Sequence, residues 1–352
     1  MSGAHDLPEA VRAILAQGTV IPAHPLALDA SRRLDERRQR ALARYSLAAG
    51  AGGLAVGVHA TQFAIREAGL FEPVLRLAAE TAAEWTERPL LLIAGVSGRT
   101  NRAVAEAATA RVLGYHTAMV SLAAFAGASE DEMIDHCARI ARELPVFGFY
   151  LQTAVGGVPL PVSFWRRFAE IDRAVAIKVA PFDRYRTIDV VRGVVEAGAE
   201  DRIALYTGND DHIVLDLLTP FGAMRDGEEI RVRIRGGLLG QWGVWTRTAV
   251  ALLERIRHAV ADDRIEADLL ALDWKITDAN GAIFDVANDF RGCIPGCHEI
   301  LRRQGLLAGT WCLDAEETLS PGQGEEIDRV CRAYPELTDD DFVAANLERW
   351  LG

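Results

Sequence analysis

The chain alternates short apolar runs with longer amphipathic segments. Segments 35–51, 101–114 and 130–144 place apolar residues at the spacing of one helical face. The apolar runs between such segments lie at 19–23, 53–58, 90–96, 117–122, 146–151, 174–180, 203–208 and, less clearly, 230–237. Continuous apolar strands separated by helices indicate a parallel sheet that is buried on both faces.

Eight strand-and-helix units within about 240 residues are typical of a (β/α)8 TIM barrel. A doubly wound open sheet is the alternative, but the segment "TVIPAHPLALD" lacks the glycine-rich turn that usually follows its first strand. The strand pattern ends near residue 258. We therefore predict an α/β fold with two domains: a barrel with a short N-terminal helix over 1–258, and a C-terminal helical domain over 259–352.

The composition indicates which kinds of partner the protein does not bind and in which compartment it acts. The formal net charge of −12 gives no electrostatic basis for binding nucleic acid or an anionic membrane surface. No apolar run reaches the length of a membrane span, and the N-terminus has no signal-peptide pattern. An odd number of cysteines, five, argues against a disulfide framework. We expect a cytoplasmic protein that acts on a small molecule.

The sequence indicates no cofactor and no metal. Cys293, Cys297 and His298 do not have a usual zinc spacing, and no second ligand pair follows them. A metal site of the class II aldolase kind, formed by His24, His59 and Asp210, is an alternative for which the spacing of these residues is not diagnostic.

In a barrel of this kind, the reacting groups lie at the C-terminal ends of the strands. The candidates are therefore the polar residues on or just after the apolar runs. They are His24, His59, Thr61, Ser97, Ser121, Tyr150, Gln152, Lys178, Asn209 and Asp210, with Gly236 and Gly237 at the eighth strand.

Lys178 is the most informative candidate. It stands inside the apolar run "AVAIKVA", and it is one of two lysines among 38 basic residues. An amine in an apolar wall loses solvation of its charged form and becomes available as a nucleophile toward a carbonyl, whereas a guanidinium does not deprotonate. The alternative is a structural ion pair with Asp210 or another carboxylate at a strand end. Lys275 is expected to be a solvated surface residue.

Tyr150 ends the apolar run that precedes the strand of Lys178. Because adjacent strand ends are neighbours in a barrel, we expect the phenol to reach the amine and to transfer protons during condensation with a carbonyl. The alternative is a core tyrosine with a satisfied hydroxyl.

Several segments resemble the dihydrodipicolinate synthase and N-acetylneuraminate lyase superfamily, the Schiff-base class I aldolases. "AVAIKVA" resembles the Schiff-base strand, Tyr150 stands 28 residues before Lys178 as the strand-5 tyrosine does, and "YTGNDD" is similar to the turn after strand 7. The resemblance covers about residues 17–325. It implies Lys178 as the Schiff-base lysine, Tyr150 as the proton relay, a 2-oxo acid such as pyruvate as substrate, and a homo-oligomer, either a dimer or a tetramer.

The chain resembles a divergent member of this superfamily. His59 stands where the family's strand-2 turn has its second threonine, and His24 stands where a threonine usually precedes proline. The segment "YLQTAVGGVP" has no arginine for a second substrate carboxylate, and only Phe125 stands where the synthases carry a tyrosine pair. We predict that His59 binds a carboxylate or acts as a general base.

The resulting hypothesis is a carbon–carbon or carbon–oxygen lyase, an aldolase or a dehydratase, that acts through an imine on Lys178. Tyr150 and His59 are its predicted catalytic partners. The predicted substrate-binding residues are His24, Thr61, Gln152, Asn209 and Asp210. The alternative is a non-catalytic, ligand-binding relative with the same barrel, since a fold does not by itself specify a function.

Overall fold

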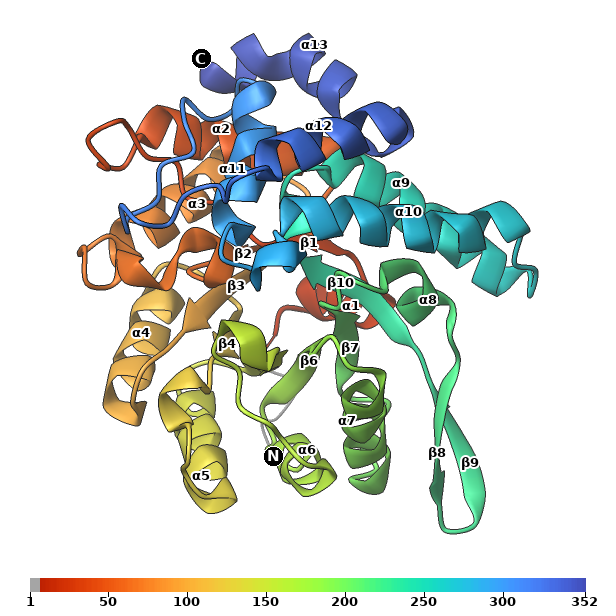
Figure 1. The fold of residues 1–352 in the computed structure, drawn as a ribbon. Coiled ribbons are helices and arrows are strands. Elements are labelled where there is room, and N and C mark those ends of the chain that lie inside the picture. The colour runs from red at the N-terminus through yellow and green to blue at the C-terminus, as the bar shows by residue number, and fades with distance from the viewer. Residues whose placement is uncertain (1–6) are drawn as a thin grey trace. The chain divides into compact units, whose positions relative to one another are not determined.

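The computed structural model describes residues 7–352 and confirms the parallel barrel (Figure 1). One eight-stranded sheet has the strand order β1-β10-β7-β6-β5-β4-β3-β2, and a separate antiparallel pair joins β8 and β9. A parallel bridge between Ala23, which follows β1, and Ala55 of β2 joins the two strands that end this order and closes the sheet into a barrel. The strands are β1 Val20–Pro22, β2 Gly53–Val56, β3 Leu91–Val96, β4 Thr117–Val120, β5 Val146–Leu151, β6 Ala174–Ala180, β7 Ala204–Thr207, β8 Phe221–Arg225, β9 Glu228–Val232 and β10 Ile234–Leu239.

Helices follow the barrel strands, and further helices complete the C-terminal part. The helices up to the last barrel strand are α1 Glu9–Gln17, α2 Glu36–Ala49, α3 Phe71–Trp85, α4 Thr100–Val112, α5 Glu130–Ala141, α6 Val162–Ala169, α7 Arg184–Glu196 and α8 Ile213–Leu218. The later helices are α9 Thr246–Ala261, α10 Ala267–Ile283, α11 Cys293–Arg303, α12 Gln323–Ala333 and α13 Asp340–Leu351. The predicted N-terminal helix and the helical C-terminal region are thus both present.

The eighth barrel strand differs from the sequence prediction. The run at 230–237 is divided between two strands, because β9 ends at Val232 and β10 begins at Ile234. β9 pairs antiparallel with β8, and only β10 joins β7 in the barrel. Gly236 lies inside β10, where a Cβ atom would come within 2.4 Å of the Thr19 carbonyl oxygen and within 2.9 Å of the Tyr206 ring. Glycine therefore allows a close approach within this strand.

The chain divides into two compact units. The first contains the chain up to Thr19, Pro89–Asn209 and Leu215–Gly237. Strands β3–β7 form its parallel sheet, and helices α4–α7 cover that sheet on its outer side (Figure 1). Helix α5 begins with a capping box, in which Ser129 and Glu132 satisfy each other's backbone N–H groups. Asp183 caps α7 by accepting from the Tyr185 and Arg186 N–H groups.

The second unit contains Val20–Arg88, Asp210–Val214 and Leu238–Gly352. Its interior joins α2 to the end of the chain. The buried Tyr45 hydroxyl donates to Asp339 Oδ2 over 2.6 Å, and the Tyr45 ring packs 5.5 Å from the Trp350 ring. Asp339 also accepts from the N–H groups of Arg247 and Thr248, so one buried carboxylate ties α13 to α9. The division of the chain at residue 258 stays a prediction.

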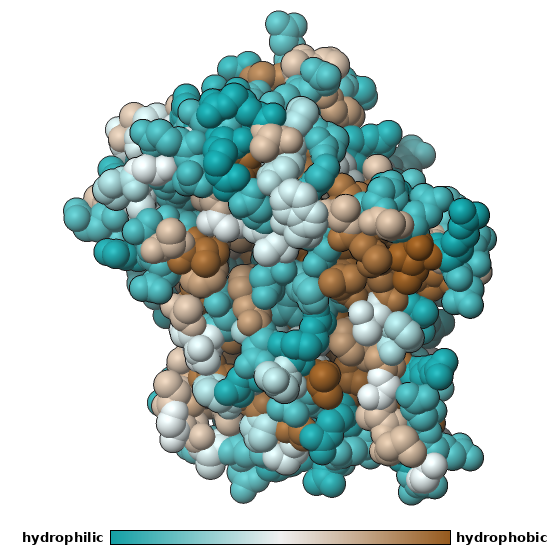
Figure 2. Space-filling model, turned by 45° about the vertical axis from the view of Figure 1, so that its right-hand side comes forward, coloured by the Kyte–Doolittle hydropathy of each residue, from teal (hydrophilic) through white to brown (hydrophobic). Residues whose placement is uncertain are grey.

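The visible surface is mostly hydrophilic, with apolar areas between the polar ones (Figure 2). Exposed large apolar side chains in the second unit include Ile265, Leu270 and Trp274, which are 48%, 45% and 56% exposed. Within residues 7–352, none of the helices combines the length and apolar character that a membrane span requires.

Three histidines are buried, which makes the free energy of unfolding depend on pH. Burial lowers the pKa of His24, His136 and His298 to about 4, because desolvation disfavours the imidazolium. The unfolded chain takes up these protons near the ordinary histidine pKa of about 6.5. The free energy of unfolding is therefore highest above about pH 6.5, where the unfolded chain binds no proton at these histidines. It falls as the pH drops toward about 4, because only the unfolded chain is then protonated.

The first prediction concerns His136, whose Nδ1 lies 3.0 Å from Thr100 Oγ1. His136→Gln should reduce the loss of unfolding free energy between pH 7 and pH 5 by about 2 kcal/mol, because glutamine takes up no proton on unfolding. Urea denaturation of both proteins at the two pH values measures this difference. An equal loss in both proteins would contradict the assignment of a buried, neutral imidazole.

Candidate active site

Lys178 lies in a fully buried strand of the first unit. All seven residues of β6 are buried, and Lys178 itself is 9% exposed. Its neighbours in register are Phe149 on β5 and Tyr206 on β7. The Nζ atom lies 4.6 Å from the centre of the Phe149 ring, so a hydrocarbon ring and not water borders the amine on this side.

The register between β5 and β6 contains a bulge. Val146 pairs with Ala174, a separation of 28 residues, but Phe147 pairs with Ala176 and Phe149 pairs with Lys178, a separation of 29. Val175 is therefore an additional residue in β6. Because side chains alternate between the two faces of a strand, a shift of one residue exchanges the face that each side chain occupies.

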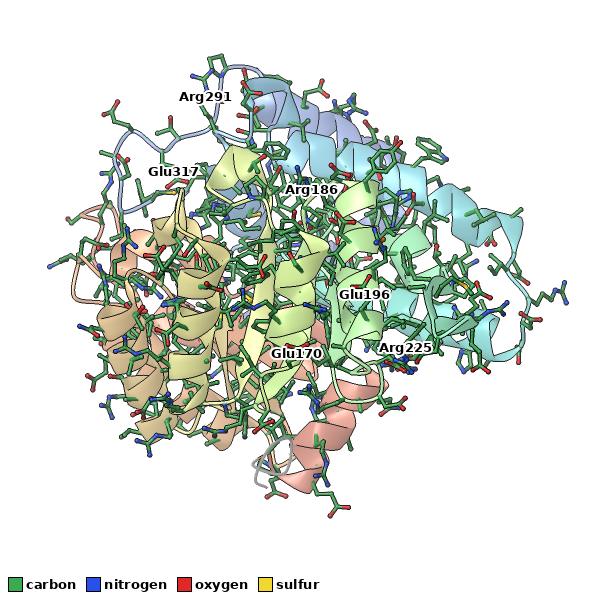
Figure 3. The ribbon with its side chains drawn as sticks, turned by 90° about the horizontal axis from the view of Figure 1, so that it is seen from below. Glu170, Arg186, Glu196, Arg225, Arg291 and Glu317 are labelled. Atoms are coloured by element: carbon green, nitrogen blue, oxygen red, sulfur yellow. The ribbon has the colours of Figure 1, made fainter. Side chains whose placement is uncertain are left out.

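The bulge places Phe149, and not Tyr150, on the face of Lys178. The Tyr150 ring packs 5.3 Å from the Trp165 ring of α6. Its hydroxyl accepts from the Leu160 N–H over 3.1 Å and from Arg186 over 3.0 Å. Arg186 lies in the first turn of α7 and is labelled in Figure 3. The expectation that the phenol reaches the amine is therefore wrong, and Tyr150 belongs to the layer between the sheet and its helices.

Gly208 provides the space for the lysine side chain on the β7 side. A Cβ atom at this position would lie 2.4 Å from Lys178 Cε and 2.7 Å from the Cβ of Ala180. The Gly208 N–H donates to the Val179 carbonyl over 2.7 Å, which continues the pairing of β6 and β7. Any other residue at position 208 would displace the stem of Lys178.

A buried carboxylate holds the residues on both sides of Gly208. Asp216 is fully buried and accepts from Thr207 Oγ1 over 2.6 Å, from Asn209 Nδ2 over 2.9 Å and from Arg184. Burial raises the pKa of this carboxyl. Asp216 therefore fixes the turn that positions Gly208 beside Lys178.

Asn209 is part of this network and not a free ligand for substrate. Its Oδ1 accepts from the N–H of Phe182 over 3.0 Å, and its Nδ2 also donates to Thr187 Oγ1 over 3.2 Å. The Phe182 backbone has φ of 52°, an unusual value for a residue with a side chain. We therefore replace the predicted substrate-binding role of Asn209 with a structural one, which supports the loop after β6.

Gln152 follows β5 at the start of a tight turn. It precedes the short 3-10 helix Thr153–Val155, and its carbonyl accepts from the N–H of Gly157 over 2.9 Å. The side chain is partly exposed. A role of Gln152 in substrate binding stays a prediction.

In the second unit, His24 follows β1 and is completely buried. The Gln39 amide is oriented by its oxygen, which accepts from the Ala27 N–H over 2.7 Å. Its nitrogen lies 2.9 Å from both His24 Nδ1 and the Pro25 carbonyl oxygen. His24 Nδ1 also lies 3.1 Å from the Pro25 carbonyl oxygen, so its contacts are compatible with either tautomer, and Nε2 has no hydrogen-bond partner among residues 7–352.

Thr61 is also buried, and its hydroxyl has a structural use. Its Oγ1 accepts from the Gly57 N–H over 3.0 Å and donates to the His24 carbonyl over 2.6 Å. This contact brings the predicted residues Thr61 and His24 together. His59 begins the 3-10 helix His59–Thr61, is partly exposed, and packs 6.0 Å from the Phe63 ring. Its catalytic role stays a prediction.

Asp210 begins the next segment of the second unit and is buried. Its backbone carbonyl accepts from Asn280 Nδ2 of α10 over 2.7 Å. Its substrate-binding role also stays a prediction. No group of three or more histidine, cysteine, aspartate or glutamate side chains is placed to hold a metal ion within the described part of the chain.

The sequence analysis missed three residues next to Lys178 or its turn: Phe149, Gly208 and Asp216. Phe149 was missed because the bulge changes the strand register, and no residue pattern in the sequence predicts that bulge. The role of Gly208 could have been inferred from the sequence, because a glycine just after an apolar strand indicates a close approach of another chain segment to the backbone. The role of Asp216 could also have been inferred, since it is an acidic residue within the apolar segment "IVLDLL".

These observations define a (β/α)8 barrel with a buried lysine on its sixth strand. The sequence matches the model of the Dihydrodipicolinate synthetase family over residues 16–224. This match covers more than half of the chain, so the chain belongs to that family, which consists of lyases of the class I aldolase type. None of the curated proteins matches the sequence.

Solved structures share the fold at low sequence identity. Dihydrodipicolinate synthase from Aquifex aeolicus is 16% identical with a TM-score of 0.72, over 91% of this chain and 99% of that one. N-acetylneuraminate lyase from Fusobacterium nucleatum is 17% identical with a TM-score of 0.69, over the same shares of the two chains. The dihydrodipicolinate synthase from Acinetobacter baumannii, solved in complex with pyruvate, is 17% identical with a TM-score of 0.72, over 90% and 98%.

The second prediction tests the position of Tyr150. Tyr150→Phe should lower the free energy of unfolding by about 1–3 kcal/mol, because the buried Leu160 N–H loses its acceptor. The rate of imine formation with a 2-oxo acid should stay within about threefold of wild type, since the hydroxyl is on the other face of the sheet. Urea denaturation and borohydride trapping measure the two effects.

The matched control is Tyr185→Phe, because Tyr185 is 84% exposed and should tolerate the change. A fall of about 100-fold in imine formation with unchanged stability of Tyr150→Phe would restore the proton-transfer role.

Proposed function

We propose that this protein is a lyase that forms an imine between Lys178 and a 2-oxo acid. The observation that carries the proposal is the amine itself, which is held in an all-buried strand between the Phe149 ring and the gap at Gly208. The pyruvate in the Acinetobacter baumannii structure supports this substrate class for a protein of the same fold. The family match over residues 16–224 contains Lys178.

The chemistry requires a neutral amine and two proton transfers. The Lys178 nitrogen attacks the carbonyl carbon, and the carbonyl oxygen takes up a proton to give a carbinolamine. Loss of that oxygen as water leaves a protonated imine, which accepts the electron pair when an adjacent carbon–carbon or carbon–oxygen bond breaks. Hydrolysis of the imine then releases the product and restores the amine.

Phe149 cannot transfer a proton, although it faces the amine. The proton carrier therefore has to come from another residue. We propose His59, because it begins the short helix three residues after the end of β2, and reacting groups in this class of barrel follow the strands. An imidazole can both donate and accept protons near neutral pH.

We propose that His24 binds an oxygen atom of the substrate. With the proton on Nε2, this atom is a buried donor without a partner among residues 7–352, and such a group is costly unless a ligand or water satisfies it. The low pKa of His24 keeps the imidazole neutral at working pH, so it would act as a hydrogen-bond donor and not as a cation.

A second candidate function is a ligand-binding relative without turnover. Phe149 favours it, because a hydrocarbon ring faces the amine where a proton-transferring group would assist imine formation. Imine formation without release of any product would support this candidate.

The third prediction is that Lys178 carries the imine. Reduction with borohydride in the presence of pyruvate should add one reduced ligand to the peptide that contains Lys178, measured by mass spectrometry. The readout is simple, because Lys275 is the one other lysine of the chain. Labelling of Lys275 alone, or no labelling by a panel of 2-oxo acids, would contradict the proposal.

Gly208→Ala provides a structural test of the same site. The added Cβ would lie 2.4 Å from Lys178 Cε, so trapping should fall by at least about tenfold. Gly281→Ala is the matched control, because a Cβ at this position in α10 meets no atom within 4 Å. Similar trapping in both variants would show that the stem of Lys178 is not confined as described.

The fourth prediction is that aspartate semialdehyde is a poor second substrate. That aldehyde carries its own carboxylate, and the loop after β5 offers Gln152 and Thr153 but no arginine up to the start of α6. We expect kcat/KM with pyruvate and the semialdehyde to stay below about 10⁴ M⁻¹s⁻¹. We expect faster cleavage or dehydration among aldol adducts and sugar acids without such a carboxylate.

His59→Ala should lower kcat on the preferred substrate by about 100-fold with a smaller change in KM, since it removes a proton carrier. Efficient turnover of the semialdehyde by the wild type would show that the missing arginine does not matter. An unchanged kcat in His59→Ala would remove this residue from the proposed mechanism.

A further inference from the structure

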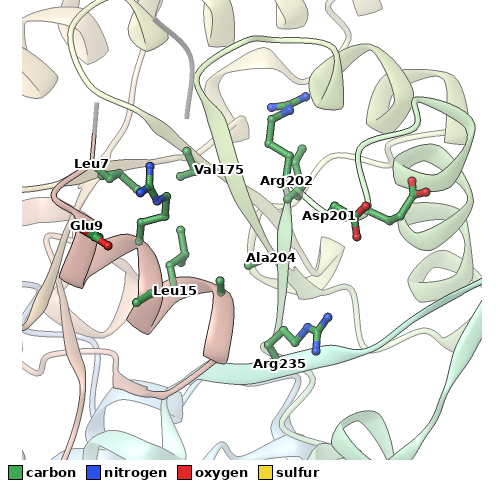
Figure 4. A pocket seen from close by; sticks show the side chains of 13 residues that line it. Leu7, Glu9, Leu15, Val175, Asp201, Arg202, Ala204 and Arg235 are labelled. Atoms are coloured by element: carbon green, nitrogen blue, oxygen red, sulfur yellow. The ribbon is translucent and has the colours of Figure 1, made fainter. Parts of the chain in front are cut away.

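A cavity of about 550 Å³ lies in the first unit (Figure 4), and Lys178 is not among its lining residues. Its lining comes from α1, from the residues that begin β6 and β7, and from Arg235 on β10. These are the N-terminal ends of the strands, whereas reacting groups in such barrels follow the C-terminal ends. The volume is in the range of sites that hold small molecules.

One side of the cavity is apolar. Leu15, Val175 and Ile203 are lining residues, and they are 4%, 2% and 2% exposed. Val175 is also the additional residue of the β6 bulge. A hydrocarbon body of a ligand can make van der Waals contact with this wall.

The other side carries three arginines. The guanidinium groups of Arg12 and Arg235 have no hydrogen-bond or ion-pair partner among residues 7–352. Arg202 donates from Nη1 to the carbonyls of Ile171 and Ala174 over 3.2 and 2.7 Å, and it donates from Nη2 to the carbonyl of Ala169. These acceptors are neutral, so its positive charge is not compensated by them, and burial lowers its pKa.

The acidic residues of the lining are Glu9, Glu200 and Asp201. Glu200 is already engaged, because both of its carboxylate oxygens accept from Arg225 over 2.8 Å. Glu9 and Asp201 remain, and both residues are exposed to solvent. The guanidinium groups of Arg12 and Arg235 are therefore the cationic groups of the lining that are available to an anionic ligand.

We propose that this cavity binds a small organic monoanion, a carboxylate with an apolar body. Arg12 and Arg235 bind the carboxylate, because a guanidinium donates two parallel hydrogen bonds to a carboxylate group. The apolar body of the ligand packs on Leu15, Val175 and Ile203. This site is separate from the imine site, and it does not depend on the reaction at Lys178.

The fifth prediction tests this site by calorimetric titration of the full chain with benzoate and with hexanoate. We expect one binding site with a dissociation constant at or below about 1 mM, and binding at least about tenfold weaker in Arg235→Gln and in Arg12→Gln. Arg231→Gln is the matched control, because Arg231 lies on the exposed β9 strand beside Glu229 and outside the cavity. Circular dichroism checks that each variant is folded.

Two further titrations distinguish carboxylate binding in this cavity from purely apolar binding and from binding at Lys178. Benzamide, the neutral analogue of benzoate, should bind at least about tenfold more weakly. Lys178→Ala should bind benzoate as the wild type does, whether or not an imine forms at Lys178. No binding of either carboxylate up to about 10 mM, equal binding of benzamide, or loss of binding in Lys178→Ala with retention in Arg235→Gln would each overturn the proposal.

Discussion

The register between β5 and β6 is the constraint on which the site depends. Val175 is an extra residue in β6, and it changes the separation of paired residues from 28 to 29. Since the side-chain period of a strand is two, this single residue determines that Phe149 shares a face with Lys178 and that Tyr150 faces the helices. The aromatic ring beside the amine and the hydrogen bonds of Tyr150 to Leu160 and Arg186 both follow from it.

The opposite side of Lys178 depends on polar contacts. Gly208 leaves room for the lysine stem, and the residues on both sides of it, Thr207 and Asn209, donate to the buried carboxylate of Asp216. A buried carboxylate is stable only when its hydrogen bonds are complete. The turn after β7 therefore has little freedom, and the position of the amine is set by strand register on one side and by this network on the other.

The candidate site was predictable where the chemistry of one residue was sufficient. Lys178 was identified because an amine inside an apolar run is costly to bury unless it is paired or reacts. The structure buries Lys178 as expected. Asn209 was assigned to substrate by its position after β7, but its amide is engaged by Phe182, Thr187 and Asp216. Position along a strand does not specify which partners a side chain finds, because most of those partners are distant in sequence.

The sequence by itself determined the barrel, its helical C-terminal region and the buried lysine, because apolar periodicity and residue type act locally and repeat along the chain. The division of 230–237 into β9 and β10, and the face on which Tyr150 lies, were decided only by tertiary structure. Strand pairing joins residues that are far apart in sequence. One inserted residue changes the register, and each side chain after it then lies on the opposite face of the sheet relative to its neighbours. No local pattern records that insertion, so only the folded chain shows which side chain faces Lys178.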